Sequence, residues 1–279
     1  MNNVINLLAM YLQYPFVRYA LICGIMISIC TSLLGVTLVL KNYALIGDGL
    51  SHIAFGVMCI AIVMNLKNTM VLILPITILA AIFLLKSNSI TVKGDAAIGF
   101  LSVMSLAMGY MVMNIFASPG NLAGDVCTTL FGATSILTLT EVQVIISIVL
   151  STIVMGIYFF SHNKIFAITY DEEFAKASGM NVNLYNLLLA IITGIVVVLA
   201  MNLVGSLLVS ALIIFPSLSA RCICKSYKSV VIYSLIYSFI CVLVGEIVAI
   251  LLGTPVGSTI VMFEIIIFII TMGISKVKT

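Results

Sequence analysis

The sequence predicts an all-α fold, a polytopic transmembrane helical bundle with about eight or nine spanning helices. Two observations predict it. Hydrophobic residues make up 63% of the 279 positions and charged residues only 8%, whereas about a quarter of an ordinary soluble domain is charged. Apolar runs long enough to cross a hydrocarbon core of about 30 Å recur along the chain with little sequence between them. A water-soluble fold is therefore excluded, and we expect residues 1–279 to form a single transmembrane domain.

Nine apolar runs approach the length of about 20 residues that a spanning helix needs. They cover residues 19–40, 49–66, 69–85, 96–117, 141–160, 184–203, 206–220, 229–252 and 256–274. Only a few residues around Gly205 separate the sixth run from the seventh. If one of these two is re-entrant or broken, the number of spanning helices is eight instead of nine.

The distribution of Lys and Arg predicts the orientation, because cytoplasmic loops are enriched in both. With nine spans and the N-terminus outside, ten of the 12 basic residues fall in inner loops or the C-terminal tail. These ten are Lys41, Lys86, Lys93, Lys164, Lys176, Arg221, Lys225, Lys228, Lys276 and Lys278. Only Arg18 and Lys67 fall outside, so we expect a cell-membrane protein with a cytoplasmic C-terminus.

Charge and motifs exclude several other classes of protein. The net charge of +3 is small and scattered, whereas a nucleic-acid partner requires a clustered basic face. Residues 1–16 have no positive charge ahead of their apolar part, and no small-residue cleavage site follows, so we expect no removed signal peptide. The chain lacks the G-x-x-x-x-G-K-[ST] phosphate loop and the common hydrolase motifs. We therefore expect no enzymatic activity and no ATPase site in this subunit.

Two ionisable residues, Asp48 and His52, fall at the start of the second run. Their i, i+4 spacing places both side chains on one face of a helix. A carboxylate oxygen and an imidazole nitrogen suit zinc or manganese, and two ligands from each of two subunits would complete four-coordination. Alternatively, Asp48 caps the helix and His52 donates a hydrogen bond to a neighbouring helix. The pair alone leaves both interpretations open.

Two further carboxyl groups, Glu246 and Glu264, fall in the last two runs, on either side of the tight turn at residues 253–257. At about 1.5 Å per residue, each lies roughly 10 to 15 Å below the outer surface. They are secondary candidates for an ion path, because ionisable groups inside a bilayer are costly and commonly functional. The alternative is that each is protonated and forms a hydrogen bond across helices.

Two loops complete the set of candidate features. The cytoplasmic segment 170–179 predicts a short amphipathic helix, with acids in its first turn and Gly179 at its end. Such a helix either connects two spans or seats the chain against a motor domain. The predicted outer loop, residues 118–138, is rich in Gly, Ser and Thr, and it is either an external docking surface or a solvated connector.

Four segments give the chain a family resemblance. Residues 34–52 have the sequence LGVTLVLKNYALIGDGLSH, residues 93–99 KGDAAIG, residues 171–179 DEEFAKASG, and residues 204–216 VGSLLVSALIIFP. In this order, over nearly the whole chain, they resemble the membrane permeases of manganese, zinc and iron ABC importers. The segment LIGDGLSH is more similar to zinc-type members of this family. Zinc is therefore the first expected cargo, manganese the second and ferrous iron the third.

The resemblance implies a homodimer in lipid whose protomers line a central path, two cytoplasmic ATP-binding subunits, and an extracytoplasmic metal-binding protein. The divalent metal is cargo, and no stably bound cofactor is expected. By position, Asp48 and His52 match groups proposed to contact the ion in that path. The segment that matches the coupling helix, which sits in a groove of the ATPase, contains Asp171, Glu172, Glu173, Ala175 and Gly179.

Two rival functions come from other classes. A gradient-driven secondary transporter would use Glu246 and Glu264 as proton carriers, and its expected sign is a pair of inverted repeats with broken helices. The sequence has no convincing internal repeat, although Gly205 and Pro216 are able to break one segment. A purely structural scaffold leaves the shared helical face of Asp48 and His52 unexplained.

The orientation is open to a direct test. A cysteine in place of Ser178 is expected to react with membrane-impermeant reagents only from the inner side, because segment 170–179 is predicted to be cytoplasmic. Labelling of intact cells from outside would overturn both the orientation and the assignment of the coupling helix.

Overall fold

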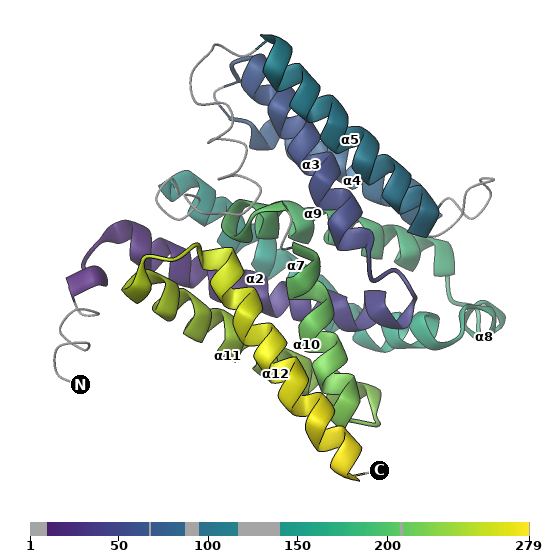
Figure 1. The fold of residues 1–279 in the computed structure, drawn as a ribbon. Helices are drawn as coiled ribbons and strands as arrows, with labels where there is room; N and C mark the ends of the chain where they lie inside the picture. The colour runs from purple at the N-terminus through teal and green to yellow at the C-terminus, as the bar shows by residue number, and fades with distance from the viewer. Residues whose placement is uncertain (1–9, 67, 87–94, 117–139, 207–208, 279) are drawn as a thin grey trace.

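The computed structural model describes residues 10–66, 68–86, 95–116, 140–206 and 209–278 (Figure 1). Within these ranges the regular elements are helices, which confirms the predicted all-α class. Their bounds are α2 Pro15–Leu40, α3 Ile46–Val63, α4 Met70–Lys86, α5 Asp95–Phe116, α7 Glu141–Tyr170, α8 Glu172–Ala177, α9 Val182–Val204, α10 Val209–Ile223, α11 Tyr227–Leu252 and α12 Val256–Lys278. The predicted outer loop lies outside the described residues.

The long helices follow the nine predicted runs in order. Seven of the described helices are long and apolar enough to cross a membrane, whereas α4 and α10 are shorter. The 15 residues of α10 span about 22 Å, less than a core of about 30 Å. The predicted break occurs at Gly205, which has a φ of 91° and follows the last residue of α9. This part of the bundle is therefore interrupted as the sequence predicted.

One predicted boundary is wrong by ten residues. The fifth run was expected to end at residue 160, but α7 continues to Tyr170 and has 30 residues, a length of about 45 Å. Hydropathy falls after residue 160, yet no Gly or Pro interrupts the chain before Asp171. A hydropathy profile detects the part of a helix that lies in lipid and misses a polar extension.

Helix α2 lies at the centre of the bundle (Figure 1). It packs against α7, α9, α10 and α11, and most of its length is buried, as is most of α3. Helices α3 and α5 lie side by side, and α4 packs against α9. Helix α8 lies at one end of the bundle, beside the end of α7 (Figure 1). The two most buried helices, α2 and α3, are consecutive in the chain.

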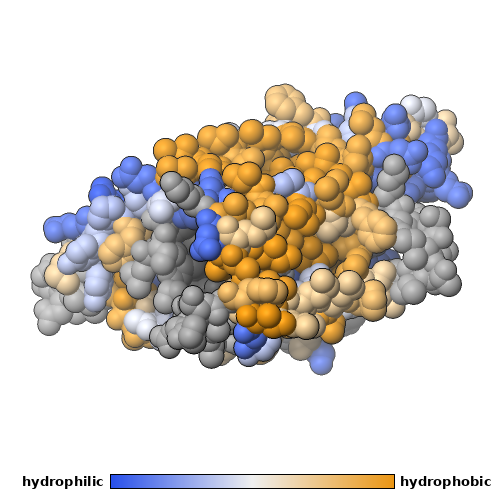
Figure 2. Space-filling view, turned by 90° about the horizontal axis from the view of Figure 1, so that it is seen from above, coloured by the Kyte–Doolittle hydropathy of each residue, from blue (hydrophilic) through white to orange (hydrophobic). Residues whose placement is uncertain are grey.

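The outer surface of the bundle is apolar. Figure 2 shows the side on which α3, α4 and α5 lie, with a broad hydrophobic surface between hydrophilic groups at its two ends. Helix α5 contributes side chains that are well exposed, among them Phe100, Val103, Met111 and Phe116. Lipid, instead of water, is the medium in which such a surface is stable. The surface therefore agrees with a multi-pass membrane protein.

Helices α3 and α5 approach each other closely because glycines lie at their crossing. A Cβ added to Gly109 of α5 would lie 2.8 Å from the Cα of Gly56, and one added to Gly56 would lie 2.6 Å from the carbonyl oxygen of Ser105. Both neighbours are backbone atoms, which cannot rotate away. Small residues that permit close backbone approach are a common basis of helix packing in membranes.

Replacing Gly109 with Ala is expected to lower the free energy of unfolding by about 1–3 kcal/mol, because the added methyl group forces the two backbones apart. Thermal unfolding in detergent measures the effect. Gly99→Ala on the same helix is the matched control, because nothing lies within 4 Å of a Cβ at that position. Equal stability of the two variants would contradict the close crossing.

Candidate functional site

Asp48 and His52 share one face at the start of α3, as the sequence predicted. Asp48 lies in the first turn of the helix, and His52 lies one turn later. The Oδ1 of Asp48 is 3.5 Å from the Nε2 of His52. The His52 side chain is 10% exposed and the Asp48 side chain 39% exposed. The pair therefore has a buried nitrogen end and an accessible oxygen end.

The structure decides against a capping role for Asp48. The N-cap of α3 is Leu45, and no side chain makes the cap hydrogen bond. A carboxylate in the first turn still interacts favourably with the helix dipole. The Nδ1 of His52 is buried and has no hydrogen-bond partner among the described residues. The expected hydrogen bond from His52 to a neighbouring helix is thus not found in the described part of the chain.

The spacing of the two donor atoms suits a shared metal ion. Bonds of about 2.0–2.2 Å at a tetrahedral angle place two ligand atoms roughly 3.3–3.5 Å apart, and the observed separation is 3.5 Å. A direct hydrogen bond would be shorter, at about 2.7–3.2 Å. Among the described residues, no three His, Cys, Asp or Glu side chains come together. One chain therefore brings together two candidate ligands at this position.

The break between α9 and α10 holds the start of α3 in place. The Ser51 hydroxyl lies 2.7 Å from the carbonyl oxygen of Ser206 and 2.8 Å from that of Asp48. A Cβ on Gly47 would lie 2.8 Å from the Cδ1 of Ile213 on α10. Sequence analysis missed Ser51 and Ser206 as supports of the site. The signal was the segment around Gly205, whose unwound carbonyl groups need donors from elsewhere.

Glu246 on α11 and Glu264 on α12 are fully buried, at 0% and 2% exposure. None of their four carboxyl oxygens has a hydrogen-bond partner among the described residues. The hydrogen bond across helices that was considered for them is therefore not found there. Both lie about 9–12 Å along their helices from the α11–α12 turn, at Leu252 and Val256. Their depths are similar, but the structure does not bring them to the Asp48–His52 pair.

The carboxyl group of Glu246 occupies the space that Gly24 leaves on α2. A Cβ at Gly24 would overlap this carboxyl group, so the glycine makes the burial of the glutamate possible. A negative charge at this position has no counter-ion or hydrogen-bond donor among the described residues. Burial of an uncompensated charge is far more costly than burial of a neutral carboxyl group. This packing favours a neutral, space-filling role.

The short helix predicted for segment 170–179 is present as α8. The Asp171 side chain caps it by accepting hydrogen bonds from the backbone N–H groups of Glu173 and Phe174, at 3.0 and 2.9 Å. Gly179 adopts a φ of 80° after the last turn, a conformation that glycine tolerates best. The acids and the glycine that predicted this helix thus act at its two ends.

The residues predicted to contact an ATPase point in different directions on and beside α8. Ala175 is buried against Ile168 and Val182 of the same chain, and Glu172 turns toward α2 and α9. Glu173, Phe174 and Gly179 are exposed. Only this exposed face is available to a partner protein. Ala175 serves the packing of its own chain.

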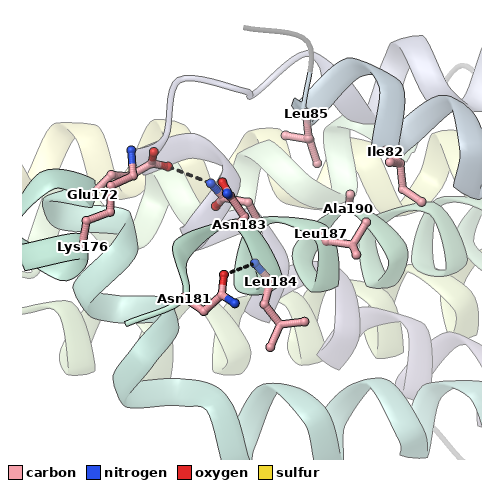
Figure 3. Close-up of a pocket in the computed structure, with 10 residues that line it drawn as sticks. Ile82, Leu85, Glu172, Lys176, Asn181, Asn183, Leu184, Leu187 and Ala190 are labelled. Atoms are coloured by element: carbon pink, nitrogen blue, oxygen red, sulfur yellow. Dashed lines mark hydrogen bonds between the residues drawn. The ribbon is translucent and has the colours of Figure 1, made fainter. Parts of the chain in front are cut away.

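A cavity of about 500 Å³ with a mixed polar and apolar lining lies beside α8 (Figure 3). Glu172, Lys176 and Asn181 line one part of it, and apolar side chains of α4 and α9, including Leu85 and Leu187, line another. Burial raises the pKa of Glu172. Hydrogen bonds from Lys41 and Asn186 and the charges of Lys41 and Lys176 lower this pKa by a larger amount. The net pKa of this carboxyl group lies below its usual value. Glu172 therefore stays ionised at neutral pH.

Replacement of Glu246 by Gln distinguishes packing from an ion path. Gln has the same shape and no charge, so the variant is expected to keep its thermal stability and the metal uptake that the resemblance implies. Stability is measured by thermal unfolding in detergent, and uptake in cells. Loss of uptake with unchanged stability would instead support a role for Glu246 in the ion path.

Comparison with known proteins agrees with the family resemblance that the sequence segments indicated. The model of the ABC 3 transport family matches residues 13–275. A manganese import system permease protein, ScaB of Streptococcus gordonii, is 28% identical over 94% of this chain and 92% of its own length. The high-affinity zinc uptake system membrane protein ZnuB of Haemophilus influenzae is also 28% identical, over 91% of this chain and 95% of its own.

A solved structure, PsaBC from Streptococcus pneumoniae in complex with Fab, agrees in fold and sequence. It superimposes with a TM-score of 0.83 and 27% identity, over 99% of this chain and 100% of that one. The predicted resemblance to the permeases of metal ABC importers is thus confirmed. With a family match that covers almost its full length, the chain belongs to the ABC 3 transport family.

Proposed function

We propose that this chain is the permease subunit of an ATP-driven importer that moves a divalent metal ion across the cytoplasmic membrane. The Asp48–His52 pair carries the proposal, because it presents an oxygen and a nitrogen donor at a spacing that suits one ion. Membership of the ABC 3 transport family supports the mode of transport. The metal is cargo in this mechanism.

The ion path is proposed to lie between two copies of the chain. Each copy contributes Asp48 and His52, so two copies supply four ligands, the number that zinc prefers. A transported ion must also leave, and few ligands that come together in one conformation allow this better than a closed cage. The accessible Asp48 carboxylate and the buried His52 imidazole would contact the ion together.

Zinc is the first proposed cargo, manganese the second and ferrous iron the third. Imidazole nitrogen suits zinc, while carboxylate oxygen also suits manganese. The two relatives that name zinc and manganese are equally identical to this chain, at 28%, so they do not rank the metals. The sequence LIGDGLSH around Asp48, which is more similar to zinc-type members, supports zinc.

The proposed partners follow from the ends of the bundle. The exposed face of α8, with Glu173 and Phe174, is proposed to seat the chain on a cytoplasmic ATP-binding subunit. An extracytoplasmic metal-binding protein would deliver the ion at the opposite end. This arrangement places the C-terminus in the cytoplasm. A gradient-driven mechanism through Glu246 and Glu264 has less support, because Gly24 makes room for a neutral Glu246.

Replacing His52 with Ala tests the site. Uptake of radioactive zinc and manganese at limiting concentration is expected to fall by about tenfold or more, since even outer-shell changes at metal sites cost this much. Asp48→Asn is expected to act in the same way, because the structure excludes a capping role that Asn could replace. Both variants should remain folded and bound to the ATP-binding subunit.

His162→Ala is the matched control for this test, because it removes the other histidine of the chain, which packs against tyrosine rings on α7 and α11. We expect this control to keep its uptake. Wild-type uptake by both site variants would eliminate the proposed metal site.

A further inference from the structure

Three polar side chains from three helices form a closed cluster at the end of the bundle that carries α8. The Nζ of Lys41 donates to the Oε1 of Glu172 at 2.8 Å and to the Oδ1 of Asn186 at 2.7 Å. The Nδ2 of Asn186 donates to the same Oε1 at 3.1 Å. Lys41 directly follows the last residue of α2, Glu172 begins α8, and Asn186 belongs to α9. Each member of this Lys41 cluster thus contacts both others.

The burial of Lys41 distinguishes this cluster from an ordinary surface ion pair. Its side chain is only 10% exposed, whereas that of Glu172 is 40% exposed. Lysine is rarely buried unless it is paired, and hydrogen bonds between charged groups are short and directional. Because Glu172 is partly in solvent, screening limits the stability that the pair can supply. The main effect of the pair is to fix the positions of Lys41 and Glu172 relative to each other.

A hydrogen-bonded turn connects Lys41 to the candidate metal site. Asn42 takes a left-handed φ of 61°, and the Tyr43 N–H donates to the Leu38 carbonyl at 2.9 Å. The Ile46 N–H then donates to the Tyr43 carbonyl at 3.1 Å. This hydrogen-bonded turn leads directly into the first turn of α3, where Asp48 lies. Only six residues separate Lys41 from Asp48 along this turn.

We propose that the Lys41 cluster is the mechanical link between α8 and the ion path. Movement of α8 on the ATP-binding subunit would displace Glu172, and through Lys41 it would reposition the first turn of α3. The separation of the Asp48 and His52 donor atoms would then depend on the state of the motor. Lys41, Glu172 and Asn186 act as positioning residues and do not touch the ion. This inference rests on the proposed function.

A purely structural role for the cluster makes a different prediction from a coupling role. A structural staple supports folding, so its loss reduces assembly, ATP hydrolysis and uptake together. A coupling element changes the amount of metal that is moved for each ATP hydrolysed, because it joins two sites. The ratio of uptake to hydrolysis is therefore the informative quantity.

The experiment uses the permease with its ATP-binding subunit in lipid vesicles, where zinc uptake and ATP hydrolysis are measured together. Lys41→Met keeps most of the side-chain volume and removes the charge. Metal moved per ATP is expected to fall at least about fivefold, within the usual range of coupling between sites. ATP hydrolysis and co-purification should stay within about twofold of wild type, a change that corresponds to well under 1 kcal/mol.

Three further variants sharpen the test. Lys225→Met makes the same change at an exposed position between α10 and α11 and is expected to behave as wild type. The exchange Lys41→Glu with Glu172→Lys restores an opposite pair, so it should recover most of the lost ratio. If Lys41→Met does not fold, Glu172→Ala breaks the same link from its partly exposed side without leaving a buried cavity.

An unchanged ratio in Lys41→Met, or in Glu172→Ala where Lys41→Met is unstable, would overturn the link. So would a proportional loss of hydrolysis and uptake, or a failure of the exchange to recover the ratio. Failure of the proposed function looks different, because the wild-type complex itself would then show no ATP-dependent uptake of zinc, manganese or ferrous iron.

Discussion

A hydrocarbon environment offers no hydrogen bonds, and this constraint organises the whole bundle. Backbone groups are satisfied within helices, and buried hydroxyl groups such as those of Thr31, Thr193 and Ser217 bond to carbonyls of the preceding turn. Polar atoms without partners among the described residues are correspondingly few, and His52, Glu246 and Glu264 are among them. His52 lies beside an accessible carboxylate, whereas the two glutamates lie in closed packing. The same solvent constraint therefore leaves a proposed metal ligand in one place and space-filling carboxyl groups in the others.

Sequence reasoning located the helices well because hydropathy responds directly to the lipid. It found α8 from the acids of its first turn and from Gly179, since capping and left-handed turns are local properties. It missed the last ten residues of α7, where the helix continues beyond the apolar run. The pairing of α3 with α5 and of α4 with α9 was not predicted, because pairing depends on where glycines of different segments meet.

The candidate site likewise contains one part that the sequence predicted and one part that it did not. The Asp48–His52 pair was predictable because its geometry follows from helical periodicity alone. The bond between Lys41 and Glu172 joins residues 131 positions apart, and no local pattern specifies it. In the sequence, Lys41 served only as one of the basic residues that set the orientation. Its burial gives it a second role, which a charge count does not reveal.

The length of α7 has a consequence for the surroundings of α8. A helix of 30 residues covers about 45 Å, or about 42 Å if it is tilted by a typical 20°, against a hydrocarbon core of about 30 Å. If its first residue lies at the outer boundary, its other end extends past the inner headgroup layer, which is only about 5–8 Å thick. Helix α8 is then carried clear of the lipid surface. The charge and crowding of the headgroups in that leaflet would thus have little access to the exposed face of α8.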